Sequence, residues 1–122
     1  MKRLIIFILL FFLQAPLVHA QEEDKLTHTY VKYDNLQDAL NNRDSAKYLD
    51  LSKTKLTQIP EQVFQLANLE VLIVNKNKLT SIPNEISKLQ HLRELHAVNN
   101  KIKVIPSTIN ALTQLKVLNL NQ

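Results

Sequence analysis

The stretch LEVLIVNKNKLTSIPNEISKLQH occupies residues 69–91, and its pattern is repeated on both sides of it along the chain. The preceding unit, AKYLDLSKTKLTQIPEQVFQLAN, occupies residues 46–68, and the following unit, LRELHAVNNKIKVIPSTINALTQ, occupies residues 92–114. Each unit is 23 residues long. The Ile-Pro pair recurs once per unit, at residues 59–60, 82–83 and 105–106. A repeat of this length is typical of a solenoid, in which successive units stack on one another.

Two local patterns alternate within each unit. Core-type apolar residues stand two apart, which is the period of a β-strand with one buried face, at residues 49/51, 72/74, 95/97 and 118/120. The Ile-Pro pair follows, and proline suits the first position of a short helix because it has a fixed φ and no N–H. Apolar pairs three residues apart then predict a buried helical face, at residues 63/66, 86/89 and 109/112.

These residues resemble the leucine-rich repeat, whose pattern LxxLxLxxNxLxxIPxxIxxLxx is matched over residues 46–122. The resemblance implies an α/β solenoid, with short parallel strands on a concave face and short helical turns on a convex face. Asn77 and Asn100 occupy the inward-facing asparagine position of the family, where the amide can satisfy buried backbone groups. Thr54 departs from this pattern in the first unit, and its hydroxyl offers fewer hydrogen bonds.

Residues 1–20 have the three parts of a secretory signal peptide: basic Lys2 and Arg3, an apolar run at 4–13, and small residues before Gln21. The alternative is an uncleaved membrane anchor, but the run is too short to span a bilayer of about 30 Å. We therefore expect cleavage and export to the periplasm, the cell surface or the exterior. The absence of cysteine and of Asn-x-Ser/Thr acceptor sites favours a bacterial exported protein.

Residues 21–45 are predicted to form an N-terminal segment with a capping helix. Asp34 and Gln37 have the spacing of a capping-box variant, and Leu36, Ala39 and Leu40 give one apolar helical face. Such a cap shields the first repeat of a solenoid from water. Residues 21–32 have no clear period and are expected to be loosely ordered.

The repeats are predicted to be three full units in residues 46–122 and a fourth unit that is truncated after Gln122. The apolar side chains of Leu118 and Leu120 would then lie at an open strand edge. We expect the chain to be a fragment of a longer protein. The alternative is a C-terminal partner that covers these two leucines.

The composition excludes several kinds of chemistry. The 122 residues include no glycine and no cysteine, so phosphate-binding glycine loops, thiol catalysis and thiolate metal sites are excluded. His91 and His96 are predicted on opposite faces, so no metal site and no cofactor is expected. A triad of Ser52, His96 and Asp50 is disfavoured because Asp50 and His96 would lie two strands, or about 10 Å, apart. No enzymatic activity is expected, unless a catalytic domain belongs to a missing part of the protein.

The charge is mildly positive. Fifteen Lys and Arg against eleven Asp and Glu give +4, and the loss of Lys2 and Arg3 on cleavage leaves +2. Because the lysines are spread along the sequence, no nucleic-acid groove is expected. No membrane insertion is expected after cleavage either.

The side chains between the core leucines are predicted to form the concave face and to bind a partner there. The predicted partner-binding residues are Tyr48, Val71, Ile73, Glu94, His96, Val98, Val117 and Asn119, and the same face includes Asp50, Ser52 and Asn75. The valines and the isoleucine are predicted to form an apolar centre within a charged rim of Lys47, Glu70, Lys76, Arg93 and Lys116. The alternative for the valines is that β-branched residues simply favour strands.

The family resemblance implies recognition of a protein ligand by this face. A glycan or cell-surface binding module is the alternative, but it would favour several aromatic side chains, and Tyr48 is the one aromatic residue in the predicted set. Glu70 and Glu94 are expected to be solvated strand residues rather than an acid–base pair.

Overall fold

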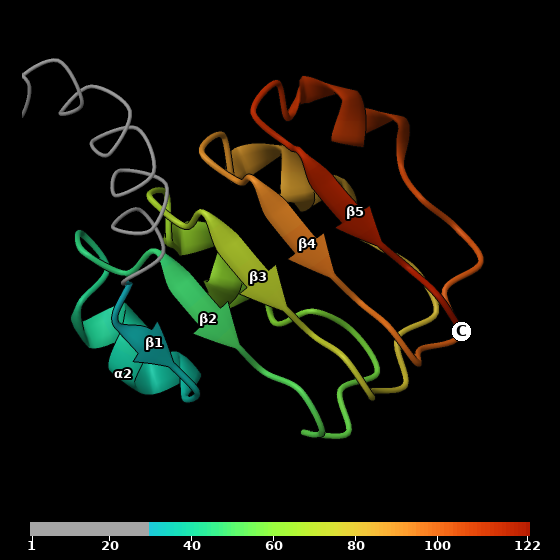
Figure 1. The fold of residues 1–122 in the computed structure, drawn as a ribbon, viewed down its shortest axis with the longest axis horizontal. Helices are drawn as coiled ribbons and strands as arrows, with labels where there is room; N and C mark the ends of the chain where they lie inside the picture. The colour runs from blue at the N-terminus through green and yellow to red at the C-terminus, as the bar shows by residue number, and fades with distance from the viewer. Residues whose placement is uncertain (1–29) are drawn as a thin grey trace, which may run out of the picture. The chain divides into compact units, whose positions relative to one another are not determined.

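The computed structural model describes residues 30–122, so the predicted signal peptide lies outside the described residues. Five parallel strands form one sheet in the order β1-β2-β3-β4-β5 (Figure 1). The strands are β1 (Lys32–Tyr33), β2 (Tyr48–Asp50), β3 (Val71–Ile73), β4 (Glu94–His96) and β5 (Val117–Asn119). The predicted strands at each Leu-x-Leu pattern are therefore confirmed, and the α/β solenoid with them. β1 was not predicted, and the expectation of loose order for residues 21–32 is wrong at Lys32, which pairs with Tyr48.

Each full repeat continues from its strand into a short 3₁₀ helix behind the sheet (Figure 1). These helices are η1 (Glu61–Gln65), η2 (Asn84–Lys88) and η3 (Ser107–Ala111). The prediction of a helical turn after each Ile-Pro pair is confirmed, but proline is the N-cap rather than the first helical residue. Its ψ lies between 136° and 159°, which is extended, and its carbonyl accepts the first hydrogen bond of the helix.

A short helix, α2 (Leu36–Asn41), follows β1 within the predicted capping segment. Its N-cap is Asn35 and not the predicted Asp34. The Asn35 backbone is extended, and its side-chain oxygen accepts from the backbone N–H of Gln37 at 2.8 Å and of Asp38 at 3.4 Å. Ala39 is fully buried, as the predicted apolar face of this helix requires.

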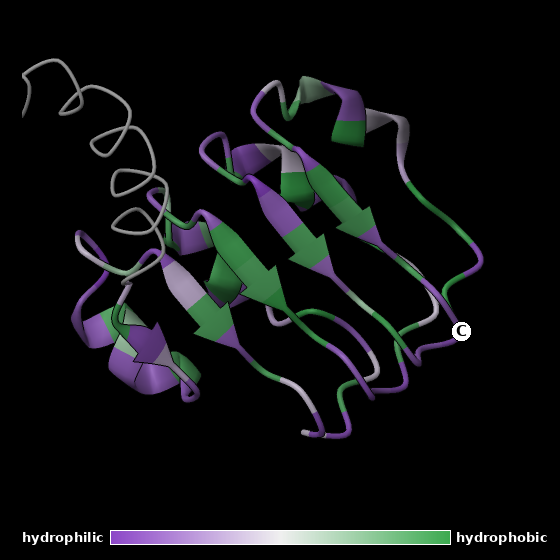
Figure 2. Ribbon diagram, viewed as in Figure 1, coloured by the Kyte–Doolittle hydropathy of each residue, from purple (hydrophilic) through white to green (hydrophobic). Residues whose placement is uncertain are grey.

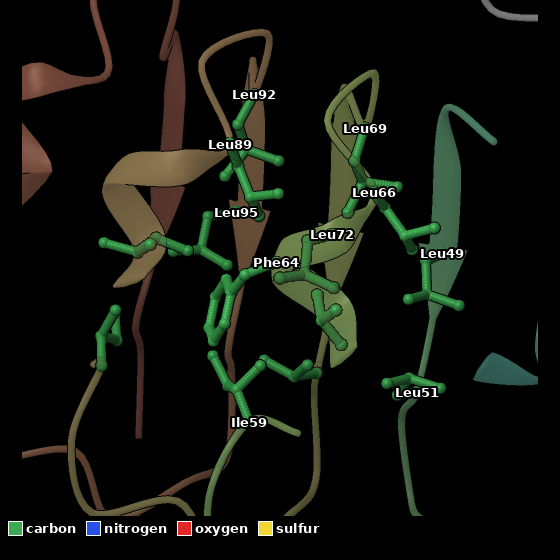
Figure 3. Close-up of a cluster of buried hydrophobic side chains, with 14 of the residues drawn as sticks. Leu49, Leu51, Ile59, Phe64, Leu66, Leu69, Leu72, Leu89, Leu92 and Leu95 are labelled. Atoms are coloured by element: carbon green, nitrogen blue, oxygen red, sulfur yellow. The ribbon is translucent and has the colours of Figure 1, made fainter. Parts of the chain in front are cut away.

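The core is a stack of leucines between the sheet and the 3₁₀ helices (Figure 3). Leu49, Leu72 and Leu95 are neighbours in register on β2, β3 and β4, and each is 0% exposed. Burial of a leucine side chain contributes about 1.5–3 kcal/mol. The equivalent Leu118 on β5 is 41% exposed because β5 is the edge strand of the described sheet. That a longer chain or a partner covers Leu118 stays a prediction.

Asn77 connects two repeats through its buried side-chain amide. Its Nδ2 donates to the carbonyl of Val74 at 2.9 Å in its own repeat, and to that of Leu51 at 3.0 Å in the preceding one. Its Oδ1 accepts from the backbone N–H groups of Thr54 and Leu56, both at 3.0 Å. Asn77 therefore satisfies backbone groups in the turn after two neighbouring strands.

Asn100 does the same one repeat later. Its Nδ2 donates to the carbonyls of Ala97 and Val74, and its Oδ1 accepts from the N–H of Leu79. Thr54, at the equivalent position of the first repeat, donates its hydroxyl to the carbonyl of Leu51 at 2.7 Å. The same hydroxyl lies 3.3 Å from Asn77 Oδ1, so it contacts both its own repeat and the following one.

The side chains of three residues fasten β1 to β2. Lys32 Nζ lies 3.1 Å from Asp50 Oδ2 and 5.6 Å from the centre of the Tyr48 ring. Burial by itself would raise the pKa of Asp50, but hydrogen bonds from Ser52 and the ion pair with Lys32 outweigh burial and hold this pKa below its usual value. The same carboxylate raises the pKa of Lys32. The charged forms of both residues are therefore favoured in the folded protein.

Replacement of Asn77 by alanine should lower the free energy of unfolding by about 3 kcal/mol, because it leaves several buried backbone groups without partners. Urea denaturation followed by circular dichroism measures this loss. Asn110→Ala is the matched control, since Asn110 is exposed on η3. Equal stability of the two variants would show that the asparagine amide does not hold the repeats together.

The substitution Asp50→Asn should destabilise the protein in a pH-dependent way. A carboxyl group whose pKa is lowered by folding adds stability above its unfolded pKa of about 3.9, and this stability is lost as the pH falls through its folded pKa. The melting temperature of the variant should therefore lie below that of the parent at neutral pH and approach it below about pH 4. Asp44→Asn, at an exposed position, is the control. A difference that is constant with pH would contradict the role of the carboxylate.

Candidate interaction surface

The open face of the sheet is the face opposite the 3₁₀ helices, which the sequence predicts to be concave. Side chains that alternate with the core leucines cross it in rows. The first row, in register, is Lys32, Tyr48, Val71, Glu94 and Val117. The second row is Asp50, Ile73, His96 and Asn119. Ser52, Asn75 and Val98 follow two residues after strands β2, β3 and β4. All eight predicted partner-binding residues therefore share this face.

The apolar centre of the open face is smaller than predicted. Val71 is 7% exposed, so it adds little accessible surface. Ile73 and Val98 are half-buried, and Val117 at the edge strand is 37% exposed. Figure 2 shows that β3 is hydrophobic along its whole length, whereas β2 and β4 also have hydrophilic residues. The backbone N–H of Val98 is held by Asn75 Oδ1 at 2.7 Å, which fixes the position of this valine.

Two pairs of polar side chains lie on β2 and β4, the strands on either side of β3. His96 Nε2 donates to Glu94 Oε2 at 2.9 Å within β4. On β2, Asp50 contacts Lys32 and accepts from the N–H of Ser52. Asp50 and His96 are thus engaged with different partners, and the residues of the disfavoured triad are not brought together. Residues 30–122 contain no group of three or more His, Cys, Asp or Glu side chains that could hold a metal ion.

The expectation that Glu70 is a solvated strand residue on the rim is wrong. It is 8% exposed and is paired with Lys47 at 3.0 Å and with Arg93 at 3.4 Å. Positions 47, 70 and 93 are one repeat apart, so the stack places a carboxylate between two cations. This spacing was the signal in the sequence that could have revealed the pairing. Glu70 therefore holds neighbouring repeats together and is not a free rim charge.

Six lysines gather on the loops that follow β2, β3 and β4. They are Lys53, Lys55, Lys76, Lys78, Lys101 and Lys103, here called the lysine stripe, and all are exposed. The lysines are spread along the sequence, but the fold gathers these six because residues 23 apart become neighbours in the stack. The recurrence of lysine at 53/76 and at 55/78/101 was the missed signal.

The other predicted histidine, His91, lies away from the open face. Its Nδ1 donates to the carbonyl of Ala67 at 3.0 Å, which ties two neighbouring convex segments together. Within residues 30–122, the helices are too short or too polar to cross a bilayer. The described residues therefore offer two surfaces with a distinct character: the open face and the lysine stripe.

A match to a protein-family profile agrees with this architecture. No curated protein matches the chain in sequence. Among solved structures, the chain is similar to a leucine-rich repeat protein of Leptospira interrogans, with 25% identity and a TM-score of 0.40. That similarity covers 75% of this chain and 35% of the other, so the chain spans about a third of that structure's length. The profile of a leucine-rich repeat region matches residues 26–122. With that match over most of its length, the chain belongs to the leucine-rich repeat family.

Proposed function

We propose that this protein is an exported protein-binding module that contacts its partner through the open face of the sheet. Leucine-rich repeat domains are typically protein-interaction modules without catalytic activity, which supports binding as the function of this chain.

The observation that carries the proposal is the pair Ile73 and Val98, which form an apolar centre next to the polar side chains of β2 and β4. Both side chains keep part of their surface accessible. They are one strand and two residues apart, or about 8 Å, so a single apolar group of a partner could cover both. An apolar centre with polar surroundings is the usual organisation of a protein interface.

The polar groups around this centre are held in place before a partner arrives. Glu94 and His96 are hydrogen-bonded to each other, and Asp50 is fixed by Lys32 and Ser52. Fixed side chains lose little conformational entropy on binding, which favours affinity. The open face therefore suits a partner with one apolar side chain and hydrogen-bonding groups around it.

Binding of an uncharged glycan is less well supported for this face. Sugar rings are usually bound by stacking on aromatic side chains. Tyr48 is the one aromatic residue of the two rows, and Lys32 Nζ already lies over its ring. The protein ligand therefore remains the preferred partner of the open face.

The double variant Ile73→Asp, Val98→Asp should weaken binding to a partner captured from the envelope or culture medium by at least about tenfold, because it places charge in the apolar centre. The partner would first be identified by pull-down with the parent protein, and its affinity would then be measured with each purified variant. Gln62→Asp, Thr113→Asp is the control, since both residues are exposed in the convex segments. Melting temperatures verify folding. An unchanged affinity of the folded double variant would refute the assignment of the open face.

Export predicts that the mature protein begins at Gln21. Mass spectrometry of the protein recovered from the envelope and medium of the producing cells should therefore find an N-terminal peptide that begins at Gln21. Replacement of Leu9 and Leu10 by Arg, within the apolar run, should keep the full-length chain in the cytoplasm. Recovery of the parent only as an unprocessed cytoplasmic chain would contradict the proposed export.

A further inference from the structure

We propose that the lysine stripe binds an anionic polysaccharide that lies along the axis of the repeat stack. This surface is distinct from the open face, and the proposal does not depend on the protein-binding function. It rests on the arrangement of the six lysines, on the absence of acidic residues among them, and on the backbone conformation of three of them.

The lysines form a two-dimensional array. Lys53 and Lys76 stand at equivalent positions of the first and second repeats, and Lys55, Lys78 and Lys101 stand at equivalent positions of all three. Neighbouring strands of a sheet are about 4.8 Å apart, so the column of Lys55, Lys78 and Lys101 extends about 10 Å along the stack. The array therefore has its longer column parallel to the stack, which suits an extended polymer with regularly spaced charges.

Backbone hydrogen bonds between repeats fix the array. The N–H of Lys53 donates to Asn75 O, and that of Lys76 donates to Val98 O. The N–H groups of Lys78, Lys101 and Lys103 likewise donate to carbonyls of the preceding repeat, namely those of Leu56, Leu79 and Thr80. The lysine backbones are thus part of the stack, and the side chains project from a rigid base.

No acid offsets this charge within the loops themselves. Residues 51–60, 74–83 and 97–106 contain the six lysines and no Asp or Glu. None of the six takes part in an ion pair among the residues that the structure describes. Glu61 and Glu85 follow immediately, at the starts of η1 and η2, and Glu61 shares a shallow hollow with Lys55. The stripe is therefore a concentrated positive surface with acids at its convex margin, which attracts polyanions.

The backbone gives a second, independent indication. Within residues 30–122, four non-glycine residues have positive φ, and three of them are lysines of the stripe: Lys53 at 59°, Lys55 at 60° and Lys76 at 56°. The fourth is Asn99, which tolerates this conformation well. A lysine in the left-handed region is less favourable than asparagine or glycine by about 1 kcal/mol. Lysine at these positions thus adopts a backbone conformation that it does not favour. Residues held in such conformations are typical of functional sites.

The side chains around the lysines favour a polysaccharide over other polyanions. The three loops contain no aromatic residue, and single-stranded nucleic acids are bound largely by stacking on aromatic rings. In the first two loops Ile59, Leu79 and Ile82 face the core. These two loops therefore have no exposed large apolar side chain that could insert into a bilayer. Val104 and Ile105 in the third loop are the exposed exceptions. Exposed Thr57, Thr80 and Asn99 offer hydroxyl and amide groups to sugar hydroxyls.

The test compares dextran sulfate with uncharged dextran of the same length, titrated into the purified full chain at about 50 mM salt and followed by calorimetry. Dextran sulfate should bind with an affinity that falls steeply with salt, and dextran should not bind. The triple variant Lys55→Gln, Lys78→Gln, Lys101→Gln should lose at least about tenfold in affinity. The matched control is Arg43→Gln, Lys88→Gln, Lys116→Gln, which removes the same charge elsewhere and should lose much less.

Equal losses in the two triple variants would overturn the proposal, because binding would then follow net charge alone. Tighter binding of polyadenylate, or of vesicles with phosphatidylglycerol in phosphatidylcholine, would replace the polysaccharide with a nucleic acid or a membrane surface. Circular dichroism and melting temperatures verify that each variant is folded. The neutral variant Ile73→Ser should keep its affinity for dextran sulfate, which separates failure of this proposal from failure of the open-face proposal.

Discussion

Hydrogen bonds from buried asparagine amides to two repeats at once are the interaction on which the rest of this structure depends. The chain must turn sharply after each strand, and the turn leaves backbone carbonyl and N–H groups away from water. Asn77 and Asn100 satisfy these groups in their own repeat and in the preceding one. Because one side chain serves two turns, β2, β3 and β4 are held in register with one another, and residues 23 apart become adjacent.

This register places equivalent residues of successive repeats side by side, so that their side chains form rows on the surface of the stack. On the open face it aligns Tyr48 with Val71 and Glu94, and Asp50 with Ile73 and His96. At the start of the strands it places Glu70 between Lys47 and Arg93, where opposite charges strengthen the stack. After the strands it brings like charges together instead. A fold that tolerates several neighbouring lysines there must draw its stability from elsewhere, and the leucine core and the asparagine amides supply it.

Sequence reasoning succeeded where a single repeat contains all the information. The strand pattern, the turn after Ile-Pro and the inward asparagines are local, and each was predicted. It failed where the outcome depends on two repeats or on backbone detail. The burial of Glu70 follows from cations in the flanking repeats, and the low accessibility of Val71 follows from its place in the middle of the sheet. Asn35 rather than Asp34 caps α2 because the backbone becomes helical one residue later than the spacing suggested.

By itself, the sequence determined the family, the length of the repeat and the side chains that alternate with the core, because the spacing of the apolar residues is visible in the sequence alone. The tertiary structure alone decided which charges meet. It showed that Asp50 pairs with Lys32 from β1 and not with His96, and that six separate lysines form one stripe. The physical reason is that charge–charge contact depends on distance in space, and stacking shortens the distance between residues 23 apart to about 5 Å.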